Sequence, residues 1–257
     1  MASSLTLDDE DFGGLSGLRA RAAENLSQAA YEKIKSDILS SELPPGTRLR
    51  VGLVCGKYGF GSSPVREALT LLSGEGLVTR TEGRGFSVAD ISAEKYVELT
   101  ETRCWLEEIA LRNSMQRGGE EWENAIVVAF YRLSRVSRPA AGTSLAVATE
   151  WTRRHAAFHD ALISECGSRW LFAYCQQLRE QAYRYKRFRG EEPPGGTVNE
   201  HEALMKVVLD RHPEVAVPRL AQHYRSKTEA ILDGFRKGVR SHQLAADGKR
   251  RIEKGDR

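Results

Sequence analysis

The sequence predicts a mainly α-helical protein in which an N-terminal winged helix-turn-helix precedes a C-terminal all-α antiparallel helical bundle. Two observations carry this prediction. Between residues 62 and 86, one segment with helical apolar spacing is followed by two short strand-like segments. From Ser92 to about Phe235, apolar residues recur at helical spacing, and no stretch alternates with the period of a strand. The 257 residues are enough for two domains, each with its own core.

The first elements can be assigned from composition, apolar spacing and the positions of proline and glycine. Residues 1–26 are polar and acidic, and we expect this N-terminal segment to be disordered. Residues 29–39 place apolar side chains at helical spacing and predict a helix. Residues 42–46 contain two prolines and a glycine, which end that helix in a turn. A short helix is expected around residues 52–58.

The next helix is the candidate DNA-reading element. Ser63 can cap it, and Pro64 suits the first helical position, where a backbone N–H has no partner in any case. Its predicted apolar face consists of Ala68, Leu69, Leu71 and Leu72. Gly74 and Gly76 are expected to end it.

A β-hairpin, the wing, is predicted to follow. Residues 77–80 read as a strand and residues 86–88 as its return, with Gly83, Arg84 and Gly85 in the turn between them. In a winged helix-turn-helix, a helix that carries a cation near its start enters the major groove of DNA. A wing with a cation at its tip lies along the DNA backbone. We expect Arg66 to read a guanine edge and Arg84 to reach the minor groove or a phosphate. The full set of predicted DNA contacts is Arg50, Ser62, Ser63, Arg66, Arg84 and Gly85.

The remainder of the chain is predicted to be helical. The DNA-binding domain is expected over residues 27–90, the helical effector, metal-binding and dimerisation domain over 91–236, and a basic flexible tail over 237–257. Ser92 is expected to cap the first helix of the second domain. The predicted helices span residues 92–117, 119–136, 144–166, 168–188, 197–211 and 213–236.

Charge and cysteine content restrict the class of protein. Residues 27–90 carry a net charge of only +1, so DNA binding must rest on a few placed cations and not on a general field. This favours a sequence-reading regulator that forms a dimer. Four cysteines are scattered without a CxxC pair, which is typical of the reduced thiols of a cytoplasmic protein. No run of eighteen apolar residues and no secretory signal is recognisable, so no membrane span is expected.

Four of the six histidines form a pattern that suggests a metal site. His155 and His159 lie four residues apart and share one helical face. His201 and His223 lie in two later helices, and His201 follows an apolar stripe. Imidazole is the commonest protein ligand for transition-metal ions, and three helices that donate inward could complete one site. Spacing alone leaves open whether these are ligands or hydrogen-bonded core residues.

Arg103 falls in an apolar stripe of the helix predicted over 92–117. A buried guanidinium needs a partner. One interpretation pairs it with Glu107, one turn on. The other reserves it for an anionic effector, whose carboxylate a planar guanidinium binds well. Tyr183 and Arg184 could also reach inward and contact the effector.

Together these residues resemble the GntR family of bacterial transcription regulators, in the branch with an FCD effector domain. The resemblance runs from about residue 31 to residue 223. In the first domain it rests on ELPPG at 42–46, PVREAL at 64–69, EGLV at 75–78 and GRGF at 83–86. In the second it rests on Phe158-His159, Glu200-His201 and His223.

The resemblance implies a homodimeric repressor on a near-palindromic double-stranded DNA operator. It also implies a divalent transition metal, zinc or alternatively nickel, beside a small carboxylic acid effector in the FCD-like bundle. His159, His201 and His223 fall on three ligand positions of the family, and His155 stands where the family has an aspartate. The segments EWTRRHAAFHDALISECGS and YRYKRF are similar to carbon-starvation regulators that respond to glutarate-type acids, which suggests a dicarboxylate.

The sequence departs from the family pattern at two places, and two alternative functions remain. The family's Ser-Arg-Thr before the recognition-helix proline is Gly61-Ser62-Ser63 here, so more of the DNA contact falls on Arg66. His155 in place of aspartate leaves the fourth ligand open and favours an imidazole-rich site. One alternative is a regulator whose metal is purely structural and which has no small-molecule switch. The other is a metal-dependent hydrolase, which would leave the winged helix without a purpose, so we expect no enzyme.

Overall fold

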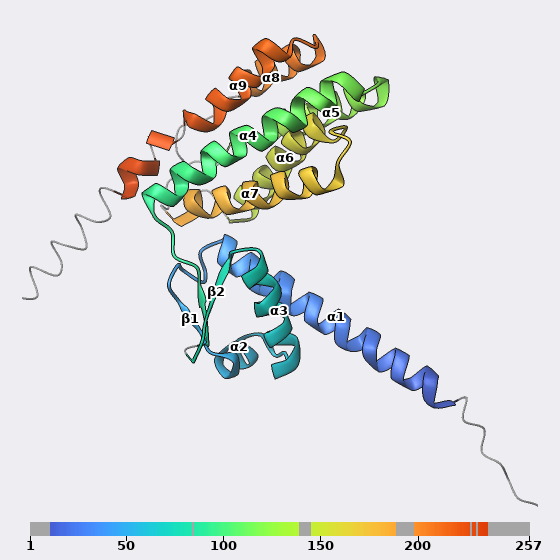
Figure 1. Ribbon diagram of the computed structural model, residues 1–257, viewed down its shortest axis with the longest axis vertical. Coiled ribbons are helices and arrows are strands. Elements are labelled where there is room, and N and C mark those ends of the chain that lie inside the picture. Colours follow the sequence, from blue (N-terminus) through green and yellow to red (C-terminus); the bar gives the residue numbers. More distant parts are fainter. Residues whose placement is uncertain are drawn as a thin grey trace, which may run out of the picture. The chain divides into compact units, whose positions relative to one another are not determined.

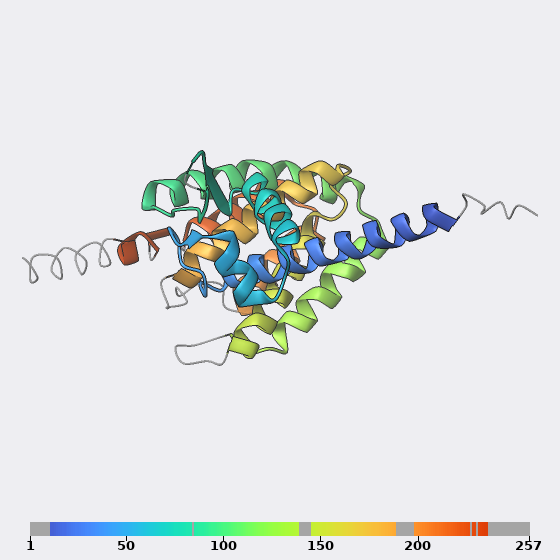
Figure 2. The same cartoon turned by 90° about the horizontal axis from the view of Figure 1, so that it is seen from below.

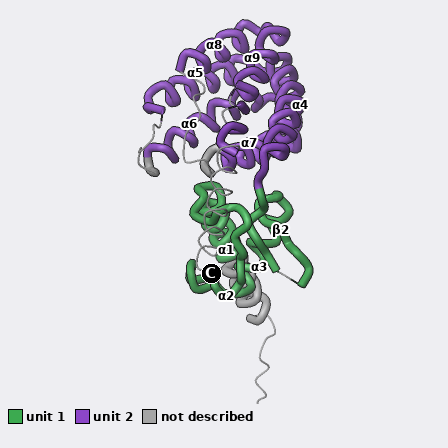
Figure 3. The backbone as a smooth tube through the Cα atoms, turned by 90° about the vertical axis from the view of Figure 1, so that its left-hand side faces the viewer, with its two compact units in different colours: residues 1–90 green, residues 91–257 purple. Residues whose placement is uncertain are grey.

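The computed structural model describes residues 11–83, 85–138, 145–188, 198–226, 228–229 and 231–235. The chain divides into two compact units, residues 1–90 and residues 91–257 (Figure 3). Helices dominate the described part of both units, and a small sheet lies in unit 1. The predicted fold class, a winged helix-turn-helix followed by a helical domain, is confirmed.

Unit 1 consists of three helices and a three-stranded antiparallel sheet in its described residues. The strand order is β1-β3-β2, with Leu49 opposite Phe86 and Val78 opposite Val88. Helix α1 packs against α3, which crosses it (Figure 1). The elements are α1 (Asp11–Leu39), β1 (Arg48–Leu49), α2 (Val51–Tyr58), α3 (Ser62–Gly74), β2 (Val78–Thr81) and β3 (Gly85–Val88).

The core of unit 1 forms where α1 meets α3. Ile34 and Ile38 of α1 and Leu69 and Leu72 of α3 are at most 1% exposed and belong to one cluster. Fully burying such a side chain stabilises the folded state by roughly 1.5–3 kcal/mol. Leu71, which the sequence placed on this apolar face, is instead 53% exposed. The buried side chains of α3, at positions 65, 68, 69 and 72, follow helical spacing on one side of the helix. Leu71 points away from that side.

The ends of α3 differ in how well the sequence predicted them. The predicted cap at Ser63 is wrong, because α3 begins at Ser62 and Gly61 is its N-cap residue, without a side-chain hydrogen bond. Pro64 therefore lies inside the first turn, where the backbone N–H groups still lack intrahelical partners. The predicted end is confirmed, since α3 ends at Gly74. Gly76 then turns the chain toward β2 with a φ of 73°.

The N-terminal segment and the sheet also differ from expectation. Disorder was expected through residue 26, whereas α1 begins at Asp11. The Leu, Ala and Arg residues between positions 15 and 23 are good helix formers, which explains the extension. The sequence did not predict β1, which has two residues and therefore no readable period. Residues 1–10, Arg84, which the sequence predicts at the tip of the wing, and the predicted tail over 237–257 lie outside the described residues.

A buried carboxylate joins α1 to α2. Asp37 is 8% exposed, and its Oδ2 accepts hydrogen bonds from Lys57 Nζ at 2.8 Å and from the Tyr58 hydroxyl at 2.7 Å. Burial opposes the ionised form of Asp37. The hydrogen bonds and the charges of Lys57 and Lys33 outweigh it and lower the pKa of the carboxyl. Burial and the bond to Asp37 raise the pKa of Tyr58 to about 12.

The variant Asp37→Asn is expected to destabilise unit 1 by about 1–3 kcal/mol, the cost of weakening a hydrogen-bonded buried charge. A lowered folded-state pKa means that the ionised carboxylate stabilises the fold above the unfolded-state value near 3.8. This contribution disappears as the pH falls through the lower folded-state pKa. Amide hydrogen exchange in α1 and α2 at pH 7 and near pH 3 measures the difference, with the exposed Glu42→Gln as control. Equal protection in both variants at pH 7 would contradict the assignment.

Unit 2 is a bundle of helices, as predicted. Helix α4 packs against α6, α7 and α9, α5 packs against α6 and α8, and α8 packs against α9 (Figures 1 and 2). Phe158 and Leu162 of α6, Leu111 of α4 and Leu204 of α8 lie at the centre of its core. The helices are α4 (Ala93–Arg117), α5 (Glu120–Ser134), α6 (Leu145–Ile163), α7 (Arg169–Phe188), α8 (Val198–Leu209) and α9 (Pro213–Arg225).

The helix ends of unit 2 lie close to the predicted ones, with one exception. Ser92 caps α4, since its side chain accepts a hydrogen bond from the Lys95 N–H, as predicted. The last predicted helix, residues 213–236, is shorter: α9 ends at Arg225, and residues 228–229 and 231–235 are helical again. All four cysteines are free thiols. Among the described residues, none of the helices combines the length and apolarity that crossing a bilayer requires.

Candidate functional site

Helix α3 presents a polar face opposite its core face. One side of α3 is buried in the core of unit 1 through Val65, Ala68, Leu69 and Leu72. The other side of the helix therefore faces outward. The exposed side chains at its start are Ser62, Ser63 and Arg66. Ser63 Oγ donates to Glu67 Oε1 at 3.3 Å. Three of the predicted DNA-contacting residues therefore share one accessible helix end.

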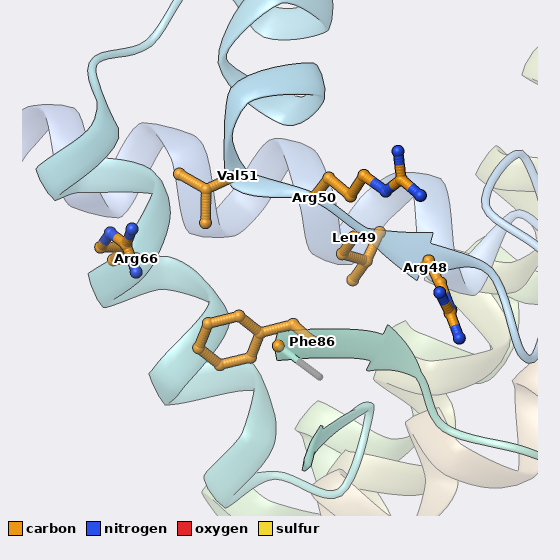
Figure 4. Close-up of a pocket in the computed structure, with 7 residues that line it drawn as sticks. Arg48, Leu49, Arg50, Val51, Arg66 and Phe86 are labelled. Atoms are coloured by element: carbon orange, nitrogen blue, oxygen red, sulfur yellow. The ribbon is translucent and has the colours of Figure 1, made fainter. Parts of the chain in front are cut away.

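A hollow lies between α3 and the wing. Arg66 of α3 and Phe86 of β3 border it, together with Arg48 of β1 and Arg50 before α2 (Figure 4). A second, adjoining hollow shares Arg66, Gly85 and Phe86 and extends along the wing to Arg80. Gly83 and Gly85 have φ values of 69° and 81°, which favour glycine in this tight turn.

Four cations surround these hollows. Arg48, Arg50, Arg66 and Arg80 are exposed, and none of them forms an ion pair with another described residue. Guanidinium groups without an ion-pair partner on a concave surface are suited to phosphates and base edges. The sequence interpretation identified Arg50 and Arg66 but missed Arg48 and Arg80. Arg48 could not be found without β1, whereas Arg80 could have been read from its place in the predicted wing strand.

The four histidines that the sequence singled out come together in unit 2. His155 and His159 lie on α6, His201 on α8 and His223 on α9, and one nitrogen of each lies within 4.8 Å of all the others. Three are buried, at 1%, 2% and 7% exposure for His159, His201 and His223, and His155 is half-buried. The Nε2 atoms of His155 and His159 are 3.2 Å apart. The cluster therefore offers four imidazole nitrogens as ligand atoms around one point.

An outer layer of side chains contacts these imidazoles. The ring of Trp151 stacks on His155, with centroids 4.7 Å apart and planes at 20°. The Tyr224 hydroxyl lies 3.1 Å from His159 Nδ1, and Glu200 Oε2 lies 3.5 Å from His223 Nδ1. Histidines that bind metals usually have such second partners, which fix the ring orientation.

Arg103 and Glu107 of α4 form a buried ion pair beside this cluster. Glu107 Oε1 accepts from Arg103 Nη2 at 2.9 Å and from Nε at 3.2 Å. The guanidinium lies over the ring of Tyr224, 4.1 Å from its centroid, and the Tyr224 hydroxyl donates to Glu107 Oε2. Burial, followed by the Glu107 charge, raises the pKa of Tyr224 well above its usual value. The structural partner of Arg103 that the sequence suggested is thus present.

Tyr183 and Arg184 lie on α7, which packs against α4 and α6. The hydroxyl groups of Tyr183 and Thr152 are 3.1 Å apart, and Arg184 is 2% exposed. Within the described chain, no hydrogen bond joins Tyr183 to the histidine cluster. Tyr224 was missed by the sequence interpretation, although it follows His223 directly and lies four residues after the buried Leu220. A tyrosine on an apolar stripe needs a hydroxyl partner, and that signal could have identified it.

Known families and proteins match both units. The gntR family of bacterial regulatory proteins matches residues 26–88, and the FCD domain matches residues 98–226. An HTH-type transcriptional regulator of Paraburkholderia xenovorans (strain LB400), BphR, is 31% identical over 232 residues, which cover 89% of this chain and 95% of the relative. The HTH-type transcriptional repressor GlaR of Escherichia coli (strain K12) is 31% identical over 199 residues, covering 75% of this chain and 90% of the relative.

Solved structures share the fold. E. coli McbR/YncC superimposes with a TM-score of 0.63 at 16% identity, covering 82% of this chain and 98% of the other. A putative GntR transcriptional regulator from Rhodococcus sp. RHA1 also gives 0.63, at 19% identity, covering 80% and 97%. The matching families and relatives are transcriptional regulators and not enzymes. This chain therefore belongs to the GntR family of bacterial transcriptional regulators, in the branch with an FCD domain, and is a DNA-binding regulator.

Proposed function

We propose that the protein is a homodimeric repressor whose grip on a near-palindromic operator is controlled by a small carboxylic acid bound beside a metal ion in unit 2. The observation that carries this proposal is the convergence of four histidine nitrogens within 4.8 Å, next to a buried arginine. The resemblance to a named repressor, GlaR, supports the direction of regulation. A dicarboxylate is the favoured effector.

The donor set suits a zinc- or nickel-class ion. Four imidazoles are borderline ligands that such ions accept, and a Zn–N bond of about 2.0–2.1 Å places tetrahedral ligands about 3.4 Å apart. His155 and His159 already meet that spacing, at 3.2 Å. His155, His159, His201 and His223 would hold the ion. When bound, the metal would supply a Lewis-acidic point of attachment for one carboxylate oxygen of the effector.

Arg103 can contribute to effector binding while it keeps its ion pair with Glu107. The two hydrogen bonds from Arg103 to Glu107 use Nε and Nη2, and Nη1 makes no hydrogen bond with another described residue. A guanidinium has five N–H donors, so one side of the Arg103 group stays available for a carboxylate. Tyr183 and Arg184 are assigned to the same effector only as neighbours in unit 2, and their part in binding is a proposal.

The switch requires a difference in affinity between two states. If the acid binds the DNA-released state more tightly, a coupling of about 1–3 kcal/mol, typical of such systems, weakens operator binding 5- to 150-fold. Measuring operator affinity with metal present, with and without glutarate, tests this directly. An unchanged affinity across a panel of small mono- and dicarboxylates would support a regulator with a purely structural metal and no small-molecule switch.

The variant Arg66→Ala is expected to weaken specific operator binding by about 1–3 kcal/mol, the value of one bidentate arginine–guanine contact. The operator is first selected from random duplexes with the wild-type protein, and its affinity is then measured by fluorescence anisotropy at fixed salt. Arg169→Ala removes the same charge from an exposed position of unit 2 and should leave affinity unchanged. Equal affinity and sequence preference in the Arg66 variant would remove that residue from the proposed contact set.

A further inference from the structure

A chain of polar contacts runs from one histidine of the cluster to the buried ion pair of α4. His159 Nδ1 contacts the Tyr224 hydroxyl at 3.1 Å, that hydroxyl contacts Glu107 Oε2, and Glu107 Oε1 is held by Arg103. The members come from three helices, α6, α9 and α4. All four residues are at most 5% exposed, so water does not compete for these bonds.

The contacts determine where the hydrogens lie. Glu107 is paired with the Arg103 guanidinium and is an ionised carboxylate, which can only accept. Tyr224 must therefore donate its single O–H hydrogen to Glu107. Because that hydrogen is used, the contact between Tyr224 and His159 requires a hydrogen on the imidazole, and His159 Nδ1 is the donor.

A neutral imidazole with its hydrogen on Nδ1 has a lone pair on Nε2. In this chain, Nε2 is the atom of His159 that faces the neighbouring imidazole of His155 at 3.2 Å. The network thus directs the lone pair of His159 into the histidine cluster. Arg103 fixes the carboxylate at the far end, and its stacking over the Tyr224 ring, at 4.1 Å, fixes the phenol between them.

We propose that Tyr224 is a positioning residue for the metal site, holding His159 in its Nδ1–H tautomer through hydrogen bonding to Glu107 and Arg103. The inference rests on the proposed metal function for its consequence, which is a higher affinity for the ion. It also gives Arg103 a second role. An effector carboxylate that binds Arg103 perturbs the same series of contacts that orients His159. The effector and the metal therefore affect each other's affinity.

The test compares wild type with Tyr224→Phe, which removes the hydroxyl and keeps the ring. In metal-free wild-type protein, ¹⁵N–¹H correlation spectra are expected to show the His159 hydrogen on Nδ1, and in the variant this preference is lost. Competition with a chromophoric chelator is expected to show 10- to 100-fold weaker Zn²⁺ binding by the variant, the usual cost of removing an outer partner of a ligand. Tyr185→Phe is the matched control, a buried tyrosine outside the chain of contacts, and should change neither readout.

The outcomes separate the two proposals. If wild-type protein binds Zn²⁺ and Tyr224→Phe binds it equally well with an unchanged His159 tautomer, the positioning role is wrong and the metal site stands. If wild-type protein binds no Zn²⁺, the proposed function fails, and the tautomer in metal-free protein still decides the inference. If the variant does not fold, an Nε2–H tautomer of His159 in the wild type overturns the proposal by itself.

Discussion

The variant His159→Ala is expected to purify without a bound transition-metal ion, whereas untagged wild-type protein carries about one ion per chain. His159 lies on the most buried side of the cluster, at 1% exposure, and is within reach of the other three donor residues. Its loss leaves three ligands and opens a void among buried side chains. Elemental analysis of protein purified without a histidine tag measures the metal content directly.

The same variant is expected to lose metal-dependent stability. An ion that binds only the folded state at 100 times its dissociation constant stabilises that state by about 2.7 kcal/mol. Added Zn²⁺ should therefore raise the unfolding midpoint of unit 2 in wild type and leave His159→Ala unchanged. All four tryptophans lie between residues 105 and 170, so their fluorescence follows unit 2 alone. His212→Ala, an exposed histidine outside the cluster, should behave as wild type. Metal-independent melting of the wild type after reconstitution would make the histidines structural.

The second large effect is expected from Glu107→Ala, which leaves the Arg103 guanidinium buried without its partner. Side-chain exposures of 6% and 1% place this ion pair inside the bundle. Breaking such a pair from one side costs about 3–5 kcal/mol, because the remaining charge is neither solvated nor compensated. Denaturant unfolding followed by tryptophan fluorescence measures the loss.

A neighbouring ion pair provides the control. Glu108 and Arg112 lie on the same helix, also four residues apart and also 2.9 Å apart, but their side chains are 42% and 36% exposed. Glu108→Ala should leave the free energy of unfolding nearly unchanged, since solvent screens and replaces the lost contact. Replacing Arg103 and Glu107 together by Met and Leu should recover much of the stability. Equal losses in Glu107→Ala and Glu108→Ala would show that burial does not govern this pair.

Unit 1 shows which features the sequence can predict. The recognition helix and the wing were predicted because proline and glycine mark their ends and apolar spacing marks their buried sides. Strand β1 was missed because two residues give no periodicity, and its pairing with β3 depends on a contact almost forty residues away. The cap at Ser63 failed for a similar reason, since three consecutive small residues make the first helical turn ambiguous by one position.

Unit 2 shows where sequence reasoning ends. The four histidines could be grouped from the sequence, but spacing alone left open whether they are ligands or core residues, because contacts between helices leave no period in the chain. Tyr224 was not identified, since its role depends on Glu107 and His159 on two other helices. The partner of Arg103 likewise depends on which side chains the fold brings next to it, and the ion pair with Glu107 is present.

Helix α3 has a consequence for how regulators of this kind diversify. Val65, Ala68, Leu69 and Leu72 are fully buried in the core of the domain, whereas the side chains of Ser62, Ser63 and Arg66 are exposed. Substitutions on the outward side usually change stability by less than 0.5 kcal/mol in either direction. Preference for a new operator can therefore arise by drift through neutral sequences, and related proteins can acquire separate sets of target genes without first becoming more stable.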